Sequence, residues 1–314
     1  MLTAWLAPVV LATLSPAPAA GPSDVTLPRE GSSLGATLID PDASAPLIVI
    51  LAGSGPTNRD GNSHVGLNAN SYRLLAEGLA LKGVASLRID KRGVGASAGV
   101  ALDAASSLAP LAEDALAWAA AMRQRTGRRC VWLLGHSEGG LVALQAAARP
   151  EGLCGVVLVS TPGRSLATIL REQFRANPAN APILDAALGM IDSLERGVTV
   201  DPATLPSPLG QLFPTSSQAY LAGMMRYDPA TMIAGVHVPV LIVQGDTDLQ
   251  VKVEDARALS RAQPRATLTV LSGVNHVLKR APAERMANLA TYANPALPIA
   301  PGVVDAIAGF VKPR

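Results

Sequence analysis

The sequence predicts an α/β fold with a mostly parallel central sheet and helices on both of its faces. Short apolar runs typical of buried strands alternate along the chain with segments typical of helices. This order favours a parallel sheet that is covered on both sides. The chain also has 314 residues, 49% of them hydrophobic, which is enough for one or two domains with a large core. No internal repeat is visible.

The N-terminal half is expected to alternate strands and helices. Segments 24–27 and 34–39 are expected to form an antiparallel pair at one edge of the sheet. The five apolar residues at 47–51 indicate the first strand that is buried on both faces. Asn70 or Ser71 is expected to cap the helix that follows. The further helices and strands up to residue 160 are expected, in order, at 71–82, 84–89, 110–126, 130–134, 141–149 and 156–160.

The alternation stops between residues 161 and 237, where no strand is evident. Helices are expected there at 166–177, 183–196 and 216–226, with prolines between them. The simplest interpretation is a helical cap insertion, 164–234, over the carboxyl edge of the sheet; the alternative is that it packs elsewhere and shapes no site. The alternation then resumes, with strands at 240–244 and 266–271 and helices at 253–263 and 303–311. The predicted core therefore consists of 21–163 and 235–314.

Ser137 lies in the sequence Gly-His-Ser-Glu-Gly, between an apolar strand and an alanine-rich helix. In this context the motif forms a nucleophile elbow, a sharp turn that presents the serine. The same pattern occurs at 31–35 and 95–99, but neither copy has a strand before it and a helix after it. We therefore predict Ser137 as the nucleophile; the alternative is a glycine-rich turn with an inert serine.

A serine nucleophile needs a base within hydrogen-bond reach and an acid that orients the base. In a sheet of this kind these groups follow in the order Ser, Asp or Glu, His. Asp246 and Asp248 come just after the strand expected at 240–244, and His276 is the only histidine that follows them. We predict His276 as the base. Spacing does not separate the two aspartates, and the one that is not the acid is expected to cap the following turn.

Two backbone amides are expected to form an oxyanion hole. One belongs to Glu138, the residue after the predicted nucleophile, and the other to Ser54 in the Gly-Ser-Gly-Pro sequence at 53–56. The alternative for the second is an ordinary turn at a strand exit. The Glu138 carboxylate has two interpretations: it suits a helix N-terminus, or it favours substrates with a positive group. The ring of His136 is expected to point away from the serine.

Several motifs together resemble a known family. The sequence Gly-Ser-Gly-Pro-Thr-Asn-Arg-Asp-Gly-Asn at 53–62 is similar to a signature of EstD-like carboxylesterases of the α/β-hydrolase superfamily, and it departs only at Asn58, where that family has Asp. Motifs at 90–97, 135–140, 245–251 and 275–276 fit the same group. The resemblance implies an α/β-hydrolase fold, Asp248 as the acid, and ester hydrolysis without a cofactor. The change at Asn58 puts a loop hydrogen bond in doubt, and related sequences are often labelled serine aminopeptidases.

Composition limits the partners. The net charge of +2 comes without a basic block, so we do not expect nucleic acid as a partner. The four histidines show no ligand spacing to the two cysteines, so no metal site is expected. Cys130 and Cys154 each open an expected strand, and the two strands are expected to be neighbours. Two interpretations of these cysteines remain open: they form a disulfide, or they are two small buried apolar residues.

Residues 1–20 have the features of a signal peptide. An apolar run at 2–14 is too short for a comfortable membrane span, and Ala17 and Ala19 form the small-x-small pattern of a cleavage site. No Lys or Arg precedes the run, so an uncleaved anchor or a misassigned start are the alternatives. We expect cleavage near Ala20, export to the periplasm or the medium, and no stable membrane span afterwards.

We therefore expect an exported serine hydrolase that acts on a small-molecule ester with a small or medium acyl chain. The first alternative is a serine aminopeptidase that uses the same three residues on short peptides. The second is a binding protein that kept the fold without catalysis. The sequence leaves the oligomeric state open.

Overall fold

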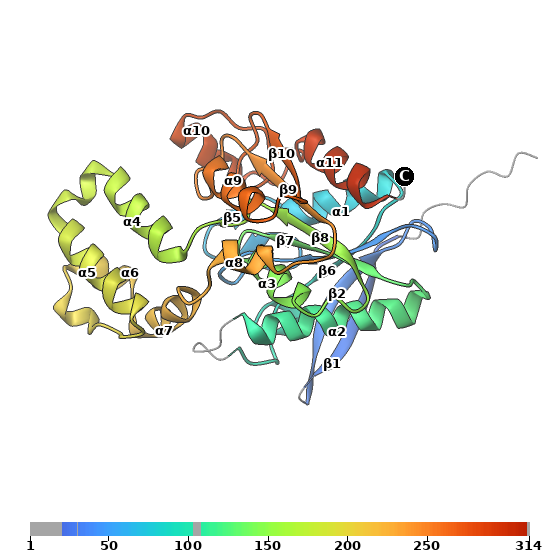
Figure 1. Ribbon diagram of the computed structural model, residues 1–314, viewed down its shortest axis with the longest axis horizontal. Helices are drawn as coiled ribbons and strands as arrows, with labels where there is room; N and C mark the ends of the chain where they lie inside the picture. Colours follow the sequence, from blue (N-terminus) through green and yellow to red (C-terminus); the bar gives the residue numbers. More distant parts are fainter. Residues whose placement is uncertain (1–20, 30, 103–107, 313–314) are drawn as a thin grey trace, which may run out of the picture.

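The computed structural model describes residues 21–29, 31–102 and 108–312, and it has an eight-stranded sheet between two layers of helices (Figure 1). The predicted signal segment, 1–20, lies outside the described residues. The strands follow the order β1-β2-β6-β3-β7-β8-β9-β10 across the sheet. No described helix combines the length and apolar character needed to cross a membrane.

The sheet is parallel except at one edge, as predicted. From β6 to β10 all neighbours pair in parallel, whereas β1 pairs with β2 and β2 with β6 in antiparallel fashion. The strands are β1 (Ser23–Arg29), β2 (Ser32–Ile39), β3 (Leu47–Leu51), β6 (Ala85–Ile89), β7 (Val131–His136), β8 (Leu153–Val159), β9 (Val240–Gly245) and β10 (Thr267–Leu271). Strands β3, β6, β7 and β9 are fully buried, which explains why they are mostly apolar.

Strand β8 begins three residues earlier than predicted, at Leu153 instead of 156. Gly155 hid this extension, because a glycine weakens the apolar pattern of a strand. A Cβ atom at Gly155 would lie 2.3 Å from the Trp132 ring on β7, so the close packing of this ring requires the glycine.

Helices cover both faces of the sheet, as predicted. Apolar side chains of α1 (Ser71–Leu81) and α11 (Pro301–Val311) form one buried cluster with one face. Those of α2 (Ala109–Thr126), α3 (Glu138–Ala147) and α9 (Val253–Ala262) form another with the opposite face.

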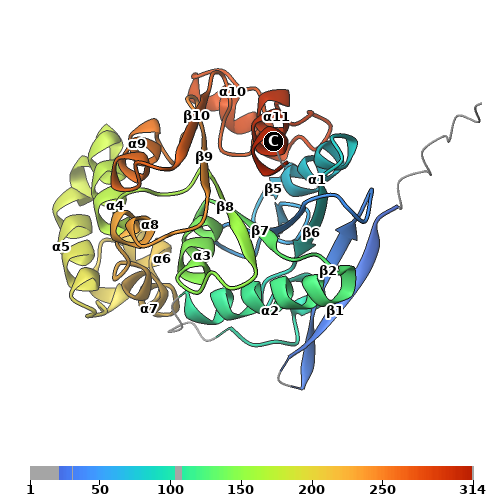
Figure 2. The same cartoon turned by 45° about the vertical axis from the view of Figure 1, so that its right-hand side comes forward.

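The segment between β8 and β9 is helical, as predicted, and forms a lobe beside the sheet (Figures 1 and 2). It has a small buried cluster of its own, to which Ala167, Ile191 and Ala222 contribute. Its longer helices lie within two residues of the predicted limits, but two six-residue helices, α6 and α8, were not predicted. The helices are α4 (Leu166–Ala176), α5 (Leu184–Glu195), α6 (Ser207–Leu212), α7 (Thr215–Met224) and α8 (Pro229–Ala234). The limits 164–234 for an insertion stay a prediction.

Three short elements near the strand ends were also missed. They are a two-stranded sheet of β4 (Asn62–Ser63) and β5 (Leu67–Asn68), and helix α10 (Arg285–Ala290). The predicted side-chain cap of α1 was wrong. The carbonyl oxygen of Asp60 accepts from the backbone amides of Tyr72 (3.2 Å) and Arg73 (3.4 Å) instead. The Asn70 side chain makes no cap, since its Oδ1 accepts a hydrogen bond from Asn62 (2.7 Å).

Cys130 and Cys154 form a disulfide between neighbouring strands. Cys130 directly precedes β7 and Cys154 is the second residue of β8, and their Cα atoms lie 5.1 Å apart. Of the two states that the sequence left open, the structure contains the bonded one. The bond joins the strand that leads to Ser137 to its neighbour.

Candidate active site

Ser137 sits on a strained turn between β7 and α3. Its φ of 54° and ψ of −124° are rare for a residue with a side chain, and such strain is concentrated at functional sites. The two motif glycines are required by close packing. A Cβ atom at Gly135 would lie 2.1 Å from the carbonyl oxygen of Gly139, and one at Gly139 would lie 2.3 Å from that of Leu51. The backbone therefore has the geometry expected of an elbow.

Asp248 and His276 meet beside this turn. His276 Nδ1 lies 2.8 Å from Asp248 Oδ2, and both residues are buried. The other carboxylate oxygen of Asp248 accepts hydrogen bonds from the amides of Gln250 (2.8 Å) and Val251 (3.0 Å). Burial by itself would raise the pKa of Asp248, but His276 and these two amides hold it below its ordinary value. An ionised Asp248 fixes the His276 tautomer that carries its proton on Nδ1 and leaves Nε2 as an acceptor.

Asp246 has a different task from the one predicted. We expected the aspartate that is not the acid to cap the following turn, but Asp248 itself caps that turn through its second oxygen. Asp246 Oδ1 accepts instead from the amide of Gly273 (2.7 Å), in the loop that leads to His276. The backbone explains this contact. The amide of Asp246 donates a hydrogen bond to the carbonyl oxygen of Leu271 (3.0 Å), so Asp246 lies beside the end of β10.

Ser137 and His276 line a common cavity. Among the described residues, no hydrogen bond joins Ser137 Oγ to the His276 ring. Contacts of this kind are often long in a free enzyme and tighten when substrate binds. The structure therefore places the two residues at one cavity.

A buried hydrogen-bond chain runs behind the serine and was missed by the sequence analysis. The Gly53 amide donates to Tyr72 Oη (3.0 Å), Tyr72 Oη lies 2.9 Å from His136 Nδ1, and His136 Nε2 lies 2.8 Å from the carbonyl oxygen of His276. Burial, together with the nearby His276, lowers the pKa of His136 to about 3. The ring is therefore neutral at pH 7 and donates from Nε2 to the carbonyl, so Nδ1 accepts the proton of Tyr72.

The predicted oxyanion loop after β3 is held on several sides. Lys91 Nζ donates to the carbonyl oxygen of Gly53 (2.6 Å), and burial lowers the pKa of this lysine. Arg88 pairs with Asp60. The Asn58 side-chain oxygen accepts from the amides of Asp60 and Asn62, both at 3.0 Å. The loop hydrogen bond that the change at Asn58 put in doubt is thus made by an amide oxygen in place of a carboxylate.

The comparisons with known proteins agree with this architecture. Residues 65–190 match the family model described as serine aminopeptidase, S33. Over 239 residues the chain is 25% identical to Esterase EstD of Thermotoga maritima, a match that covers 74% of the chain and 54% of that protein. The chain therefore spans about half the length of this curated relative.

Two solved structures share the arrangement of the elements. Est1E of Butyrivibrio proteoclasticus with ferulic acid bound has a TM-score of 0.54 and 21% identity, covering 90% of this chain and 99% of that chain. A hydrolase from Pseudomonas aeruginosa PA01 has a TM-score of 0.56 and 20% identity, covering 92% of this chain and 98% of that chain. The chain has the α/β-hydrolase fold. In this chain Ser137, Asp248 and His276 follow in the order typical of the fold.

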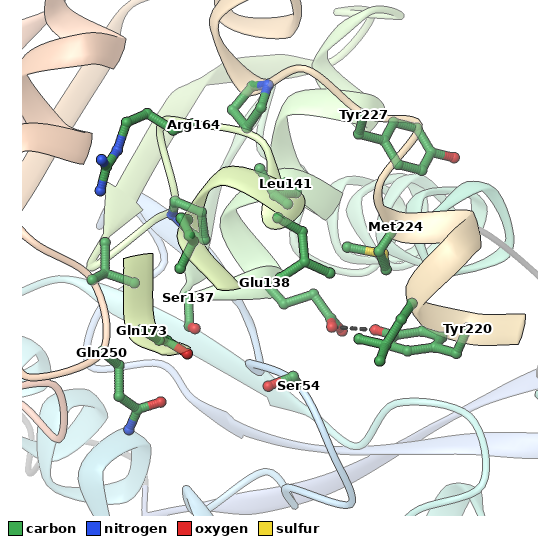
Figure 3. Close-up of a pocket in the computed structure, with 16 residues that line it drawn as sticks. Ser54, Ser137, Glu138, Leu141, Arg164, Gln173, Tyr220, Met224, Tyr227 and Gln250 are labelled. Carbon is green, nitrogen blue, oxygen red and sulfur yellow. Dashed lines mark hydrogen bonds between the residues drawn. The ribbon is translucent and has the colours of Figure 1, made fainter. Parts of the chain in front are cut away.

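Glu138 connects the core around the sheet to the helical lobe. Its side chain is buried, and its Oε2 accepts a hydrogen bond from Tyr220 Oη on α7 (Figure 3). Burial, and then the charge of Glu138, raise the pKa of Tyr220. The phenol therefore stays protonated at neutral pH and remains the donor of this contact.

Two cavities meet at Ser137. The first, of about 200 Å³, lies between the elbow and the helical lobe, and the second, of about 160 Å³, lies between the loop after β3 and the His276 loop. Ser54, Ser137 and Gln250 line both cavities. Within the described ranges, no group of three or more His, Cys, Asp or Glu side chains is placed to hold a metal ion.

Proposed function

We propose that this α/β-hydrolase cleaves carboxylic esters through an acyl-enzyme on Ser137. The observation that carries the proposal is the arrangement at the elbow. Ser137 lies on a strained turn at the cavity lined by His276, and Asp248 holds Nδ1 of that histidine at 2.8 Å. The sequence similarity to Esterase EstD and the fold shared with Est1E support an ester as the substrate.

In the proposed acylation step, His276 Nε2 takes the proton of Ser137 Oγ while this oxygen forms a bond to the ester carbonyl carbon. The carbonyl oxygen becomes negative and accepts hydrogen bonds from the amides of Ser54 and Glu138. The intermediate then collapses, the bond from carbon to the alcohol oxygen breaks, and His276 gives the proton to that oxygen. Asp248 stabilises the imidazolium that exists between the two proton transfers.

Deacylation repeats the same steps with water. His276 takes a proton from a water molecule, the water oxygen attacks the acyl-enzyme, and the bond to Ser137 Oγ breaks as His276 returns the proton to it. The free acid leaves. One pre-aligned amide of an oxyanion hole contributes roughly a hundred- to thousand-fold to such rates, so Ser54 and Glu138 are proposed to act through their backbones.

Two substitutions test this proposal directly. Ser137→Ala and His276→Ala should each abolish turnover of a nitrophenyl ester, because one removes the nucleophile and the other the base. Matched controls exist on the surface: Ser216→Ala on α7 and His64→Ala are exposed and should keep the wild-type rate. Retained turnover in either site variant, with its melting temperature unchanged, would disprove the proposed chemistry.

A serine aminopeptidase is the second candidate, because the matching family model carries that description and Glu138 places a carboxylate at the cavity. An aminopeptidase needs a carboxylate to bind the substrate ammonium group, but Glu138 already accepts a hydrogen bond from Tyr220. A panel of nitrophenyl esters and aminoacyl anilides with the same acyl group separates the two activities. A preference for the anilides would favour the peptidase. Failure of Ser137 to react with a fluorophosphonate would favour the non-catalytic binding protein.

A further inference from the structure

The two cavities at Ser137 are lined by different side chains, and this difference indicates a substrate class. We propose that the cavity under the helical lobe binds the acyl chain and that the cavity beside His276 binds an alcohol carrying further hydroxyl groups. This inference rests on the proposed ester hydrolysis. The substrate would be an ester between an apolar carboxylic acid and a polar, hydroxylated alcohol.

The position of His276 decides which cavity holds which part of the ester. His276 must protonate the departing alcohol oxygen, so the alcohol has to lie beside its ring. His276 lines the second cavity and is absent from the lining of the first. The amides of Ser54 and Glu138 take the carbonyl oxygen. The remaining substituent of the carbonyl carbon, the acyl chain, is therefore directed into the first cavity.

The lining of the first cavity suits an apolar chain. Its apolar lining comes mainly from α3, α4 and α7 and the segments next to them, with Pro229 of α8 and Val251 before α9: Leu141, Pro162, Leu166, Ile169, Leu221, Met224, Tyr227, Pro229 and Val251. The charged groups in this cavity are already paired. Arg164 bonds to both oxygens of Asp255 (2.9 and 3.0 Å) and to Glu172 (2.5 Å), and Glu138 is bonded to Tyr220. An acyl chain therefore meets mostly carbon surface, with Gln173 as a polar neighbour, and no unpaired charge.

The second cavity offers groups for hydroxyl recognition. Gln250 Nε2 donates to Tyr292 Oη (3.4 Å), and both residues line this cavity. Among the described residues, neither the Gln250 side-chain oxygen nor the Tyr292 proton has a further partner. Burial raises the pKa of Tyr292 to about 12, so the phenol keeps its proton at neutral pH. Together they present one acceptor and one donor to an alcohol with its own hydroxyl groups.

The experiment compares two substrate series. In the first, nitrophenyl esters vary from acetate to octanoate while the alcohol is constant. In the second, butyrate is constant and the alcohol is either glycerol or ethanol. Wild-type protein should prefer the longer acyl chains in the first series and glyceryl butyrate over ethyl butyrate in the second, measured as kcat/KM.

Variants of residues that line only one cavity should change one series only, whereas Gln250 lines both cavities and is judged by the alcohol series alone. Leu221→Trp should lower kcat/KM for octanoate relative to acetate at least tenfold, and Met224→Ala should shift the preference to longer chains. Tyr292→Phe and Gln250→Leu should lower the glyceryl-to-ethyl ratio about fivefold each, the loss of about one hydrogen bond. Tyr292→Phe should not change the deacylation rate of the butyryl-enzyme, because the alcohol has already left at that stage. This rate is measured in the steady-state phase that follows a burst of nitrophenol.

Matched controls separate a local effect from general damage. Tyr227→Phe makes the same change as Tyr292→Phe, but in the first cavity, and it should leave the glyceryl-to-ethyl ratio at the wild-type value. Gln211→Leu repeats the change of Gln250→Leu at an exposed position on α6. If Leu221→Trp altered the alcohol ratio and Tyr292→Phe altered chain-length preference, the assignment would be wrong while ester hydrolysis stood. If no ester were turned over and Ser137 stayed unlabelled, the proposed function would fail as well.

Discussion

His136 links the two parts of the proposed catalytic machinery at the scale of single residues. Through Tyr72 it reaches the Gly53 amide, next to the predicted oxyanion residue, and through Nε2 it holds the backbone of His276. The chain has a defined direction, because a neutral His136 accepts at Nδ1 and donates at Nε2. We infer that Tyr72 and His136 are positioning residues that set the distance between oxyanion loop and base.

Tyr72→Phe tests this role with the smallest change. The aromatic packing stays, but His136 Nδ1 loses its donor and the Gly53 amide its acceptor. We expect kcat to fall about ten- to hundredfold, as for a small misplacement of reacting groups, with KM nearly unchanged. The rate of Ser137 labelling by a fluorophosphonate should fall in parallel. An unchanged kcat at an unchanged melting temperature would show that the chain only stabilises the fold.

The two aspartates after β9 should respond very differently to the same substitution. Asp248→Asn removes the negative charge beside His276 and favours the wrong tautomer, so kcat should fall about 10⁴-fold. Asp246→Asn weakens a single hydrogen bond to the Gly273 amide, so activity should stay within about tenfold and stability should fall by about 1 kcal/mol. Steady-state kinetics with urea unfolding measures both effects. The reverse ranking would reassign the acid.

Sequence reasoning at this scale singles out residues where the local context carries a signal. The strand, turn and helix around Ser137 were predictable because they follow one another in the chain, whereas the role of Ser137 stays a prediction. Asp248 required the family resemblance, since Asp246 has the same local context. Tyr72, Gln250 and Tyr292 were missed, because their contacts join segments that are distant in sequence and nothing in the local pattern marks them.

At the scale of elements, the disulfide joins β7 and β8 at the start of the strand that carries the elbow. Cys130 and Cys154 are 24 residues apart, and closing a loop of this length in the unfolded chain stabilises a protein by about 3 kcal/mol. The double variant Cys130→Ala/Cys154→Ala should therefore lose about 2–4 kcal/mol of unfolding free energy and keep most of its kcat. Urea unfolding under oxidising conditions measures the loss. Wild-type stability in this double variant, or unchanged stability of the native protein in reductant, would contradict a stabilising role of the disulfide.

Element limits followed the sequence closely where the pattern was long enough. Strand β3 and helix α11 lie within two residues of their predicted limits, because β3 is a continuous apolar run and α11 is apolar except at Asp305. Helices α6, α8 and α10 have six residues each, less than two turns, so no helical periodicity can appear in their sequences. Tertiary contacts rather than local propensity hold such helices.

At the scale of the whole molecule, the order of the strands and the position of the helical lobe follow from packing. The alternation of elements predicts a parallel sheet, but it does not give the order β2-β6-β3-β7. That order brings the loop after β3 beside the elbow after β7, and it is why Ser54 and Glu138 line one cavity. The contact from Tyr220 to Glu138 then fixes α7 over this cavity.

We propose that the protein is exported and that residues 1–20 are removed. The apolar run and the small residues at 17 and 19 support this proposal, and the disulfide is consistent with an oxidising compartment. Mass spectrometry of protein from the periplasm or the medium should find an N-terminus near Gly21. Recovery of the protein only inside the cell with Met1 intact would refute both cleavage and export.

The acyl-enzyme itself is the most direct evidence for the proposed chemistry. Protein quenched in acid during turnover of nitrophenyl butyrate should carry one butyryl group, and fragmentation of the peptide that begins at Cys130 should place it on Ser137. In Ser137→Ala the same peptide should stay unmodified. A butyryl group on another residue, or full ester turnover with no covalent intermediate and undiminished activity in Ser137→Ala, would contradict a serine hydrolase mechanism.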